Sequence, residues 1–486
     1  MLFTSANFVI LVLITFALFY TPALRRAQTV LLIVASLLFY LVNSYEANQT
    51  EYVILLIASI TINAFCSHRT FFSTTLKRAR FWATLGVVAN LAILASFKYV
   101  GLLGHTLPTA WTNEAGPAHF LLMITLPVGI SFFTFEGISL LVDTFKARDA
   151  KDFFGTSLDA PRRHHVLSTT LFISFFPHLV AGPILKAHDF FPQIKPKFLG
   201  DVNWLFCFRK IVIGYFLKMV IADSLASWTS WIQYPYFLSM GGKDLLVLLF
   251  GYSMQIFADF AGYSLIAIGI AGLFGYRFPE NFNFPYISRS FSEFWQRWHI
   301  SLSSWLKEYL YIPLGGNRKG PVRTYVNLII VMFLGGLWHG AAWSYAIWGT
   351  THGVALALER FFKDRIKLPD NAIANAFKML GVFSIVTLAW LLFKLPDFRD
   401  VIRYVNAIGT NWSGDMDRPR VYNVLIFSLP VVMYHLAYLA LQNTPIRTSF
   451  AWPKLQRWAA PVSYGVMMFL IVVNSGISGD FIYFQF

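Results

Sequence analysis

Charged side chains are scarce in this chain: only 13% of its 486 residues are Asp, Glu, Lys or Arg, whereas 56% are hydrophobic. A soluble globular protein carries about 25% charged residues. The mean hydropathy of +0.56 describes a protein whose surroundings are mostly lipid. This composition excludes a disordered protein, a collagen and a small disulfide scaffold. It predicts an all-α polytopic membrane protein.

Cysteine is nearly absent too, and the common nucleotide-binding and hydrolase motifs are missing. Cys66 and Cys207 have no CxxC or CxxxC spacing, so we expect two structural thiols and no thiolate zinc site. The sequence has no P-loop, no dinucleotide-binding glycine fingerprint and no GxSxG nucleophile elbow. Function therefore has to be sought in isolated polar residues within apolar segments, where ionisable groups are costly and commonly functional.

Basic residues exceed acidic ones by 39 to 24, a net charge of +15. In a membrane protein this excess is explained by basic cytoplasmic loops, so nucleic acid is not an expected partner. Arg25 and Arg26 follow the first apolar run, whereas Glu46 and Glu51 follow the second without a basic residue. Five consecutive loops keep this alternation, which predicts an N-terminus outside. No small-residue cleavage site follows the first run, which is interpreted as an uncleaved span.

Long apolar runs, each a candidate span, recur along the whole chain. They predict about 11–12 transmembrane helices in a single domain over 1–486, with N-terminal spans in 1–145, a core in 277–360 and C-terminal spans in 374–486; the core contains the residues that are later expected to be catalytic. The runs are 4–20, 29–42, 52–66, 82–104, 118–142, 203–228, 244–275, 324–342, 344–359, 374–394, 421–441 and 461–475.

One apolar segment, 166–185, breaks the alternation of loop charge. It contains Pro177, His178, Gly182 and Pro183, and proline in particular interrupts a helix. Non-helical backbone survives at membrane depth only inside protein or beside water. We interpret 166–185 as a re-entrant segment that enters and leaves on the cytoplasmic side. A kinked span is the alternative.

Aromatic residues recur at helical spacing after residue 294. Trp295, Trp298, Leu302, Trp305 and Tyr309 fall on one stripe of a helix. The sequence predicts an amphipathic interfacial helix here, with its tryptophans at headgroup level and polar residues on the opposite stripe.

Three histidines are candidates for chemistry. His299 lies on the flank of the predicted interfacial helix, and His339 is flanked by glycines in an apolar segment. Burial favours the neutral imidazole, which accepts a proton at pH 7. His352, thirteen residues further on, is the third. The alternative for each is a histidine that donates to a neighbouring carbonyl. No carboxylate lies at ligand spacing, so no metal is expected.

Three acids, Glu136, Asp223 and Asp259, also fall in apolar runs. In a solute transporter they would form a substrate or proton path. The alternative is that each pairs with a buried Arg, Lys or Tyr.

Several motifs together carry a resemblance to a known family. They include residues 127–135, 180–184, 278–283, 293–305, 309–316, 336–343 and the terminal 481–486. On these motifs the sequence resembles the membrane-bound O-acyltransferase family. Within the family it is similar to the bacterial branch of the alginate O-acetylation membrane protein and the D-alanine transfer protein of teichoic acids.

The resemblance implies helices around a tunnel that joins a cytoplasmic acyl donor to an outward acceptor. It implies catalytic roles for His339 and His299. The donor would be a thioester, with acetyl-CoA expected as a substrate and no tightly bound cofactor. Supporting or donor-binding roles are expected for further residues, namely Arg297, Trp298, Ser301, Ser303, Lys307, Glu308, Tyr309, Asn317, Trp338 and His352.

The same resemblance implies a bacterial inner-membrane enzyme for the O-acetylation of an extracytoplasmic polysaccharide. Its expected partners are the lipid bilayer, the polysaccharide acceptor and a periplasmic SGNH-type acetyltransferase or another polysaccharide-modification partner. D-alanyl transfer to teichoic acid is the alternative within the family. Lys307 and Glu308 stand where the branch commonly has Arg and Asp, and Leu265 where an aspartate is common, which leaves acceptor and partner details open.

Overall fold

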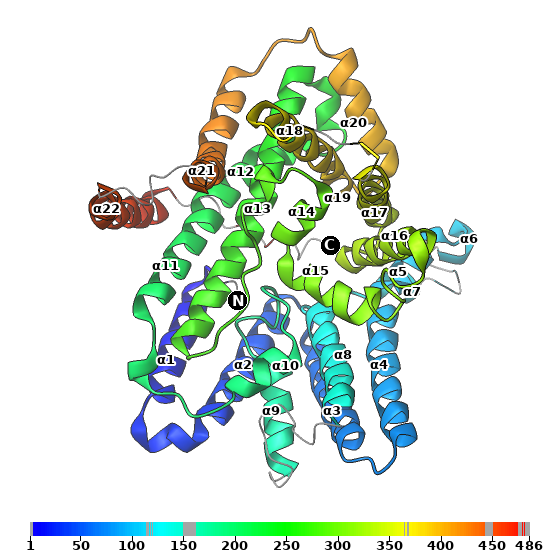
Figure 1. The fold of residues 1–486 in the computed structure, drawn as a ribbon, viewed down its shortest axis with the longest axis vertical. Coiled ribbons are helices and arrows are strands. Elements are labelled where there is room, and N and C mark those ends of the chain that lie inside the picture. The colour runs from blue at the N-terminus through cyan, green and yellow to red at the C-terminus, as the bar shows by residue number, and fades with distance from the viewer. Residues whose placement is uncertain are drawn as a thin grey trace. The chain divides into compact units, whose positions relative to one another are not determined.

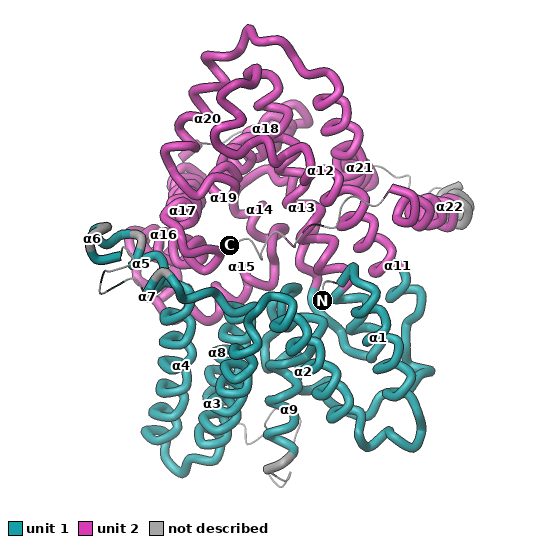
Figure 2. Tube along the Cα trace, turned by 180° about the vertical axis from the view of Figure 1, so that it is seen from behind, with its two compact units in different colours: residues 1–208, 267–279 teal, residues 209–266, 280–486 magenta. Residues whose placement is uncertain are grey.

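The computed structural model describes residues 3–112, 116, 118, 120–148, 162–363, 365–366, 369–442, 451–474, 479 and 481. These residues form helices and no strand (Figure 1), as the composition predicts. Of the predicted features, the terminal motif after Phe481 lies outside the described residues. The chain divides into two compact units (Figure 2): unit 1 comprises Met1–Phe208 and Ala267–Pro279, and unit 2 comprises Arg209–Ile266 and Glu280–Phe486. The prediction of a single domain stays a prediction.

Within the described part of the chain, seven helical stretches are long and apolar enough to cross a membrane. This agrees with a multi-pass membrane protein. The stretches are Pro22–Glu46, Thr50–Phe71, Leu76–Lys98, Gly242–Leu273, Gly320–His339, Ala372–Lys394 and Arg418–Gln442.

Two apolar runs that were each predicted as one span depart from a regular α-helix in the structure. In the run 118–142, the long helix α8 (Ile130–Ala147) begins only after Gly129. Gly129 has φ of 77°, and a Cβ there would lie 2.6 Å from the carbonyl oxygen of Leu179, so only glycine fits this turn. In the run 203–228, α11 (Trp204–Tyr215) continues through a π-helix, Phe216–Ala222, before α12 begins.

In unit 1, α3, α4 and α8 pack against one another. The group of α3, α4 and α8 is held by buried amides: Asn63 and Asn90 donate to each other's side-chain oxygens at 3.1 and 2.9 Å. Gly137 on α8 leaves the space that these amides occupy. The helices of unit 1 are α1 (Ala6–Phe19), α2 (Gln28–Glu46), α3 (Val53–Phe71), α4 (Leu76–Lys98), α5 (Val100–Thr106), α6 (Thr109–Thr112), α7 (Phe120–Met123), α8, α9 (Arg162–Ser174) and α10 (Ala187–Phe190).

The segment predicted to be re-entrant lies in unit 1 and is broken as expected. Helix α9 ends at Ser174, and residues 175–186 form no helix although every one of them is buried. The predicted interruption near Pro177 and Gly182 is therefore confirmed. The side on which the segment enters the membrane stays a prediction.

Unit 2 is built around two helices whose backbones touch. A Cβ on Gly336 of α16 (Gly320–His339) would lie 2.2 Å from the carbonyl oxygen of Tyr345, and one on Gly349 of α17 (Trp343–Lys363) would lie 2.1 Å from that of Met332. Small residues allow this close approach of helices. The other helices of unit 2 are α12 (Asp223–Thr229), α14 (Phe291–Arg297), α15 (Ile300–Leu306), α18 (Ala372–Ala389), α19 (Leu391–Lys394), α20 (Phe398–Thr410), α21 (Arg418–Gln442) and α22 (Ala451–Val473).

Two further helices contribute to both units. They are α11 and α13 (Gly242–Leu273), and the chain passes from one unit to the other within each of them. Residues 242–266 of α13 belong to unit 2 and carry side chains that contact the candidate site.

Candidate active site

His299 lies at a break between two short helices. Helix α14 ends at Arg297, Trp298 is extended, and His299 has φ of 44° before α15 begins at Ile300. The predicted continuous helix through Trp295–Tyr309 is therefore wrong. A positive φ is uncommon for a residue with a side chain and is found repeatedly at functional sites.

The break is stabilised by Asn281, eighteen residues earlier in the chain. Its backbone oxygen accepts from the N–H of Ile300 at 3.0 Å, and its side-chain oxygen accepts from the N–H of Ser301 at 3.2 Å. These are N–H groups of the first turn of α15, which has no capping side chain of its own. A distant amide thus caps α15 and makes the local turn at His299 favourable.

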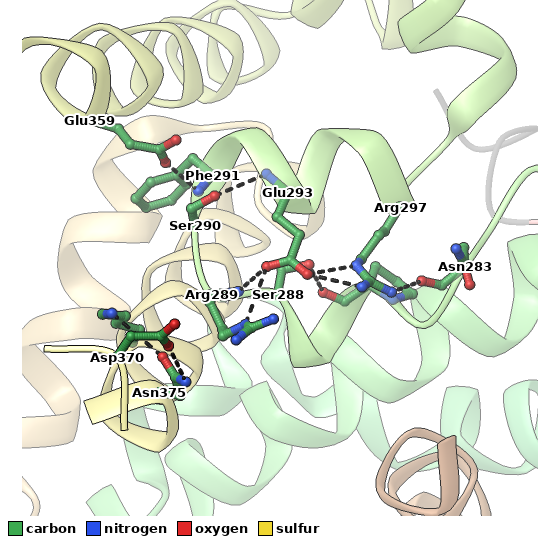
Figure 3. Close-up of polar contacts among 12 residues, drawn as sticks. Asn283, Ser288, Arg289, Ser290, Phe291, Glu293, Arg297, Glu359, Asp370 and Asn375 are labelled. Carbon is green, nitrogen blue, oxygen red and sulfur yellow. Dashed lines mark hydrogen bonds and ion pairs between the residues drawn. The ribbon is translucent and has the colours of Figure 1, made fainter. Parts of the chain in front are cut away.

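The preceding helix, α14, is fixed by polar contacts at its start (Figure 3). Ser290 caps the helix by accepting from the N–H of Glu293 at 3.1 Å. Glu359 of α17 accepts from the N–H groups of Phe291 and Ser292. Negative charge at a helix N-terminus is favourable. These contacts tie α14 to α17.

His339 is the last residue of α16 and is 4% exposed. Its position follows from the backbone contact between α16 and α17, because Gly336 lies one turn earlier on the same helix. The ring centroids of His299 and His339 are 6.1 Å apart. The structure therefore brings together the two histidines that the resemblance identified, from positions forty residues apart.

Aromatic rings enclose both histidines. Phe260 of α13 lies edge-on to His299 at 4.6 Å between centroids, and Trp348 lies edge-on to His339 at 5.3 Å. Burial lowers the pKa of His299, which lies outside the candidate spans, to about 3. The imidazole of His299 is therefore neutral at pH 7. The further rings in contact with one or both histidines are Trp338 and Phe393.

His352 also contacts Trp348, with ring centroids 4.8 Å apart. It is 1% exposed, and neither ring nitrogen has a hydrogen-bond partner among the described residues. Its ring is stacked on Phe294 of α14 at 6.0 Å. His352 thus belongs to the same aromatic cluster as His339, and Trp348 contacts both histidines.

The tryptophans predicted at headgroup level lie inside the protein instead. Trp298 is 1% exposed and Trp305 is 5% exposed. Trp298 packs against Trp390 at 4.9 Å between centroids and against Phe282 at 5.0 Å. The helical break at Trp298 turns this side chain into the ring cluster, which a continuous interfacial helix would not do.

The remaining predicted residues divide between the buried site and the surface. Ser301 donates to Asn281 at 2.9 Å, and Ser303 donates to the carbonyl of Trp298 at 3.4 Å. The Arg297 guanidinium is paired with Glu293 at 2.9 Å. Lys307 and Asn317 are exposed, whereas Glu308 and Tyr309 are half-buried. Only the serines, Trp298 and Trp338 therefore lie with the buried histidines.

Sequence reasoning missed Asn281 and Phe260 as site residues. Asn281 was visible only as part of the motif 278–283, and nothing in the spacing showed that its amide faces His299. Phe260 is one of many phenylalanines in apolar helices. Among the described residues, no three His, Cys, Asp or Glu side chains lie together as metal ligands would.

The buried acids have partners in the structure. Asp223 and Asp259 each lie 2.8 Å from the ammonium of Lys218, as the pairing alternative expected. Glu136, in unit 1, has its Oε1 2.6 Å from Nδ1 of His178. The partner of Glu136 is thus a histidine, not the Arg, Lys or Tyr that was expected.

Residues 154–395 match the membrane-bound O-acyltransferase family. The chain is 35% identical to the probable alginate O-acetylase of Pseudomonas aeruginosa, over 92% of this chain and 84% of the relative. It is 35% identical to the peptidoglycan O-acetyltransferase of Helicobacter pylori, over 78% and 73%. It is 29% identical to the teichoic acid D-alanyltransferase of Bacillus subtilis, over 64% and 77%.

This chain belongs to the membrane-bound O-acyltransferase family. The predicted class, a multi-pass membrane acyltransferase, is confirmed by the family match, by relatives that match most of the chain and by the seven apolar helices among the described residues.

Proposed function

We propose that this chain moves an acetyl group from cytoplasmic acetyl-CoA to an acceptor outside the inner membrane, for O-acetylation of an extracytoplasmic polysaccharide. The observation that carries the proposal is the buried pair of His299 and His339, with ring centroids 6.1 Å apart. Relatives with 35% identity are named for the O-acetylation of alginate and of peptidoglycan. That identity is higher than the 29% to a D-alanyltransferase, which favours acetyl over D-alanyl transfer.

The chemistry requires one proton transfer in each direction. As the acceptor hydroxyl attacks the thioester carbonyl, its proton moves to the imidazole of His339, which acts as general base. The tetrahedral intermediate then collapses, the carbon–sulfur bond breaks, and the thiolate of coenzyme A takes up the proton. The surrounding rings of Trp348 and Phe393 exclude water, which protects the thioester from hydrolysis.

The donor would approach from a basic face of unit 2. Lys307, Arg318, Lys319 and Arg323 are all exposed, and a basic surface attracts an anionic nucleotide. Positive-inside charge explains the same residues without a ligand. With the N-terminus outside, as the loop charges predict, these residues lie on the cytoplasmic face.

A periplasmic SGNH-type partner would complete transfer to the polymer, because the chain has no GxSxG motif of its own. The solute-transporter alternative has less support. Asp223 and Asp259 are paired with Lys218, and Glu136 lies against His178.

The test uses sealed vesicles that contain the purified protein and acetyl-CoA labelled in both the acetyl group and the nucleotide. We expect the acetyl label on an external hydroxyl acceptor while the nucleotide label stays inside. Release of intact acetyl-CoA or net flux of a solute would contradict the proposal. Vesicles with His339→Ala protein at equal amount serve as the control.

A further inference from the structure

Asn281 makes more hydrogen bonds at the candidate site than a capping residue needs. Its side-chain oxygen accepts from the N–H of Ser301, from the hydroxyl of Ser301 and from the ring of His299, at 3.2, 2.9 and 3.0 Å. Its amide nitrogen donates to the hydroxyl of Ser264 on α13 at 3.1 Å. The side chain is 1% exposed.

These contacts fix which atom of the amide faces which neighbour. The backbone N–H of Ser301 can only donate, so the atom of Asn281 opposite it is the oxygen. The same oxygen lies 3.0 Å from Nδ1 of His299. An oxygen that faces a ring nitrogen at this distance requires a hydrogen on that nitrogen. In the neutral ring, Nδ1 therefore carries the proton and Nε2 carries the lone pair.

The neighbours of His299 keep this ring neutral. The group that orients it is an amide, which has no charge to stabilise an imidazolium. His339 of α16 is a titratable group that faces it, while α13 presents Phe260 and α16 also presents Trp338. The ring is fully buried, and burial disfavours its charged form.

We propose that Asn281 is a positioning residue that holds His299 in the Nδ1–H tautomer, so that Nε2 accepts a hydrogen bond from an O–H or N–H group of a substrate. The inference rests on the proposed acyl transfer and assigns the two histidines different tasks. His339 takes the proton of the acceptor hydroxyl, and His299 orients a substrate. A neutral His299 has no hydrogen on Nε2 and cannot stabilise an oxyanion through that nitrogen.

The tautomer is measured directly by nitrogen-15 NMR of the full chain in detergent micelles, with labelled histidine. The signal that disappears in His299→Gln is assigned to His299. We expect a protonated Nδ1 and an unprotonated Nε2 in the wild type, and a mixture of tautomers in Asn281→Leu. A protonated Nε2 in the wild type overturns the proposal.

Asn281→Asp supplies a functional test that keeps the geometry. The carboxylate accepts the same bonds, and the hydroxyl of Ser264 can turn to donate to it. The negative charge favours the imidazolium and raises the pKa of His299 by about 1–3 units. We expect the acid limb of the pH–rate profile to move upward by a similar amount. An unchanged profile in an active, folded Asn281→Asp enzyme contradicts the proposal.

Asn281→Leu removes the amide that orients His299, so Nε2 is no longer held toward the substrate. We expect acetyl transfer to fall about 100-fold. The change in KM identifies the substrate group: a raised KM for the acceptor indicates its O–H, and a raised KM for acetyl-CoA indicates an amide N–H of its pantetheine arm. An unchanged rate in folded Asn281→Leu protein overturns the positioning role.

Asn283→Leu is the matched control, because the contacts of Asn283 with Arg297 are made by its backbone (Figure 3). We expect wild-type rate and pH profile from it. The NMR result does not depend on turnover. A wild type with no acyl transfer but with the Nδ1–H tautomer therefore refutes the proposed function alone, and an active enzyme with the other tautomer refutes this inference alone.

Discussion

Each unit contains a fully buried histidine whose Nδ1 lies against a side-chain oxygen, but one oxygen belongs to a carboxyl group and the other to an amide. In unit 1, Nδ1 of His178 lies 2.6 Å from the carboxyl oxygen of Glu136. In unit 2, Nδ1 of His299 lies 3.0 Å from the amide oxygen of Asn281. A carboxyl group can exchange a proton with the ring, whereas an amide orients the ring and carries no charge of its own. The comparison sets a buried contact within unit 1 beside the histidine that we propose orients a substrate.

The largest effect should come from the candidate site in unit 2. His339→Ala removes the proposed general base, and we expect acetyl transfer to fall by about 10²–10⁴-fold. The measurement is acetyl incorporation into the external acceptor at equal protein amount. His435→Gln is the control, because this buried histidine donates from its Nδ1 to the carbonyl of Val431 in its own helix. Equal losses in both variants would refute a special role for His339.

The buried pair in unit 1 should respond in stability. His178→Leu leaves the carboxyl group of Glu136 buried without its neighbour, and an unsatisfied buried polar group costs about 1–3 kcal/mol. Thermal unfolding in detergent measures this loss. The double variant with Glu136→Gln and His178→Gln places two amides that can hydrogen-bond to each other and should recover most of the stability. A double variant as unstable as His178→Leu would contradict a polar contact between the two positions.

Glycines at helix contacts in the two units provide a second test of the comparison. A Cβ on Gly336 would meet the backbone oxygen of Tyr345 at 2.2 Å, whereas one on Gly137 would meet the ends of the Asn63 and Asn90 side chains at 2.5–2.7 Å. Backbone atoms move less easily than the ends of side chains. Gly336→Ala should therefore lower stability by about 1–3 kcal/mol, and this loss should be larger than the loss in Gly137→Ala. Gly336→Ala should also lower acetyl transfer, because His339 lies one turn away. A larger loss of stability in Gly137→Ala would refute this order.

The smallest effect is expected from Glu136→Gln, which makes the unit 1 pair resemble that of unit 2. The amide keeps the size of the side chain and can accept from His178, so the change in stability should be within about 1 kcal/mol. Acetyl transfer should stay at the wild-type rate, because the proposed reaction uses neither residue. Thermal unfolding and the vesicle assay measure the two quantities. A loss of activity with intact stability would show that the pair takes part in turnover.

Much of this architecture could be predicted because it depends on local sequence. The apolar composition predicts the helices, and Pro177 with Gly182 predicts the break in 166–185. The glycines around His339 indicate close packing at that residue. The resemblance identified both histidines, and the structure brings them together.

The rest depends on contacts between distant residues. The side-chain and backbone oxygens of Asn281 stabilise the turn at His299. The periodicity of Trp295–Tyr309 carries no sign of this distant residue, so it predicted a continuous helix. The partner of Glu136 is likewise His178, forty-two residues away. Such pairs leave no periodic pattern in a single sequence.

Helix α17 supports both segments that carry the candidate histidines. Through Glu359 it caps α14, which leads directly to His299, and through Gly349 it touches the backbone of α16, which ends at His339. One attachment is a carboxylate that accepts from backbone N–H groups, and the other is a direct contact between two backbones. Both act on segments that lead to the two imidazoles, so a change in the bend of α17 would displace both histidines together.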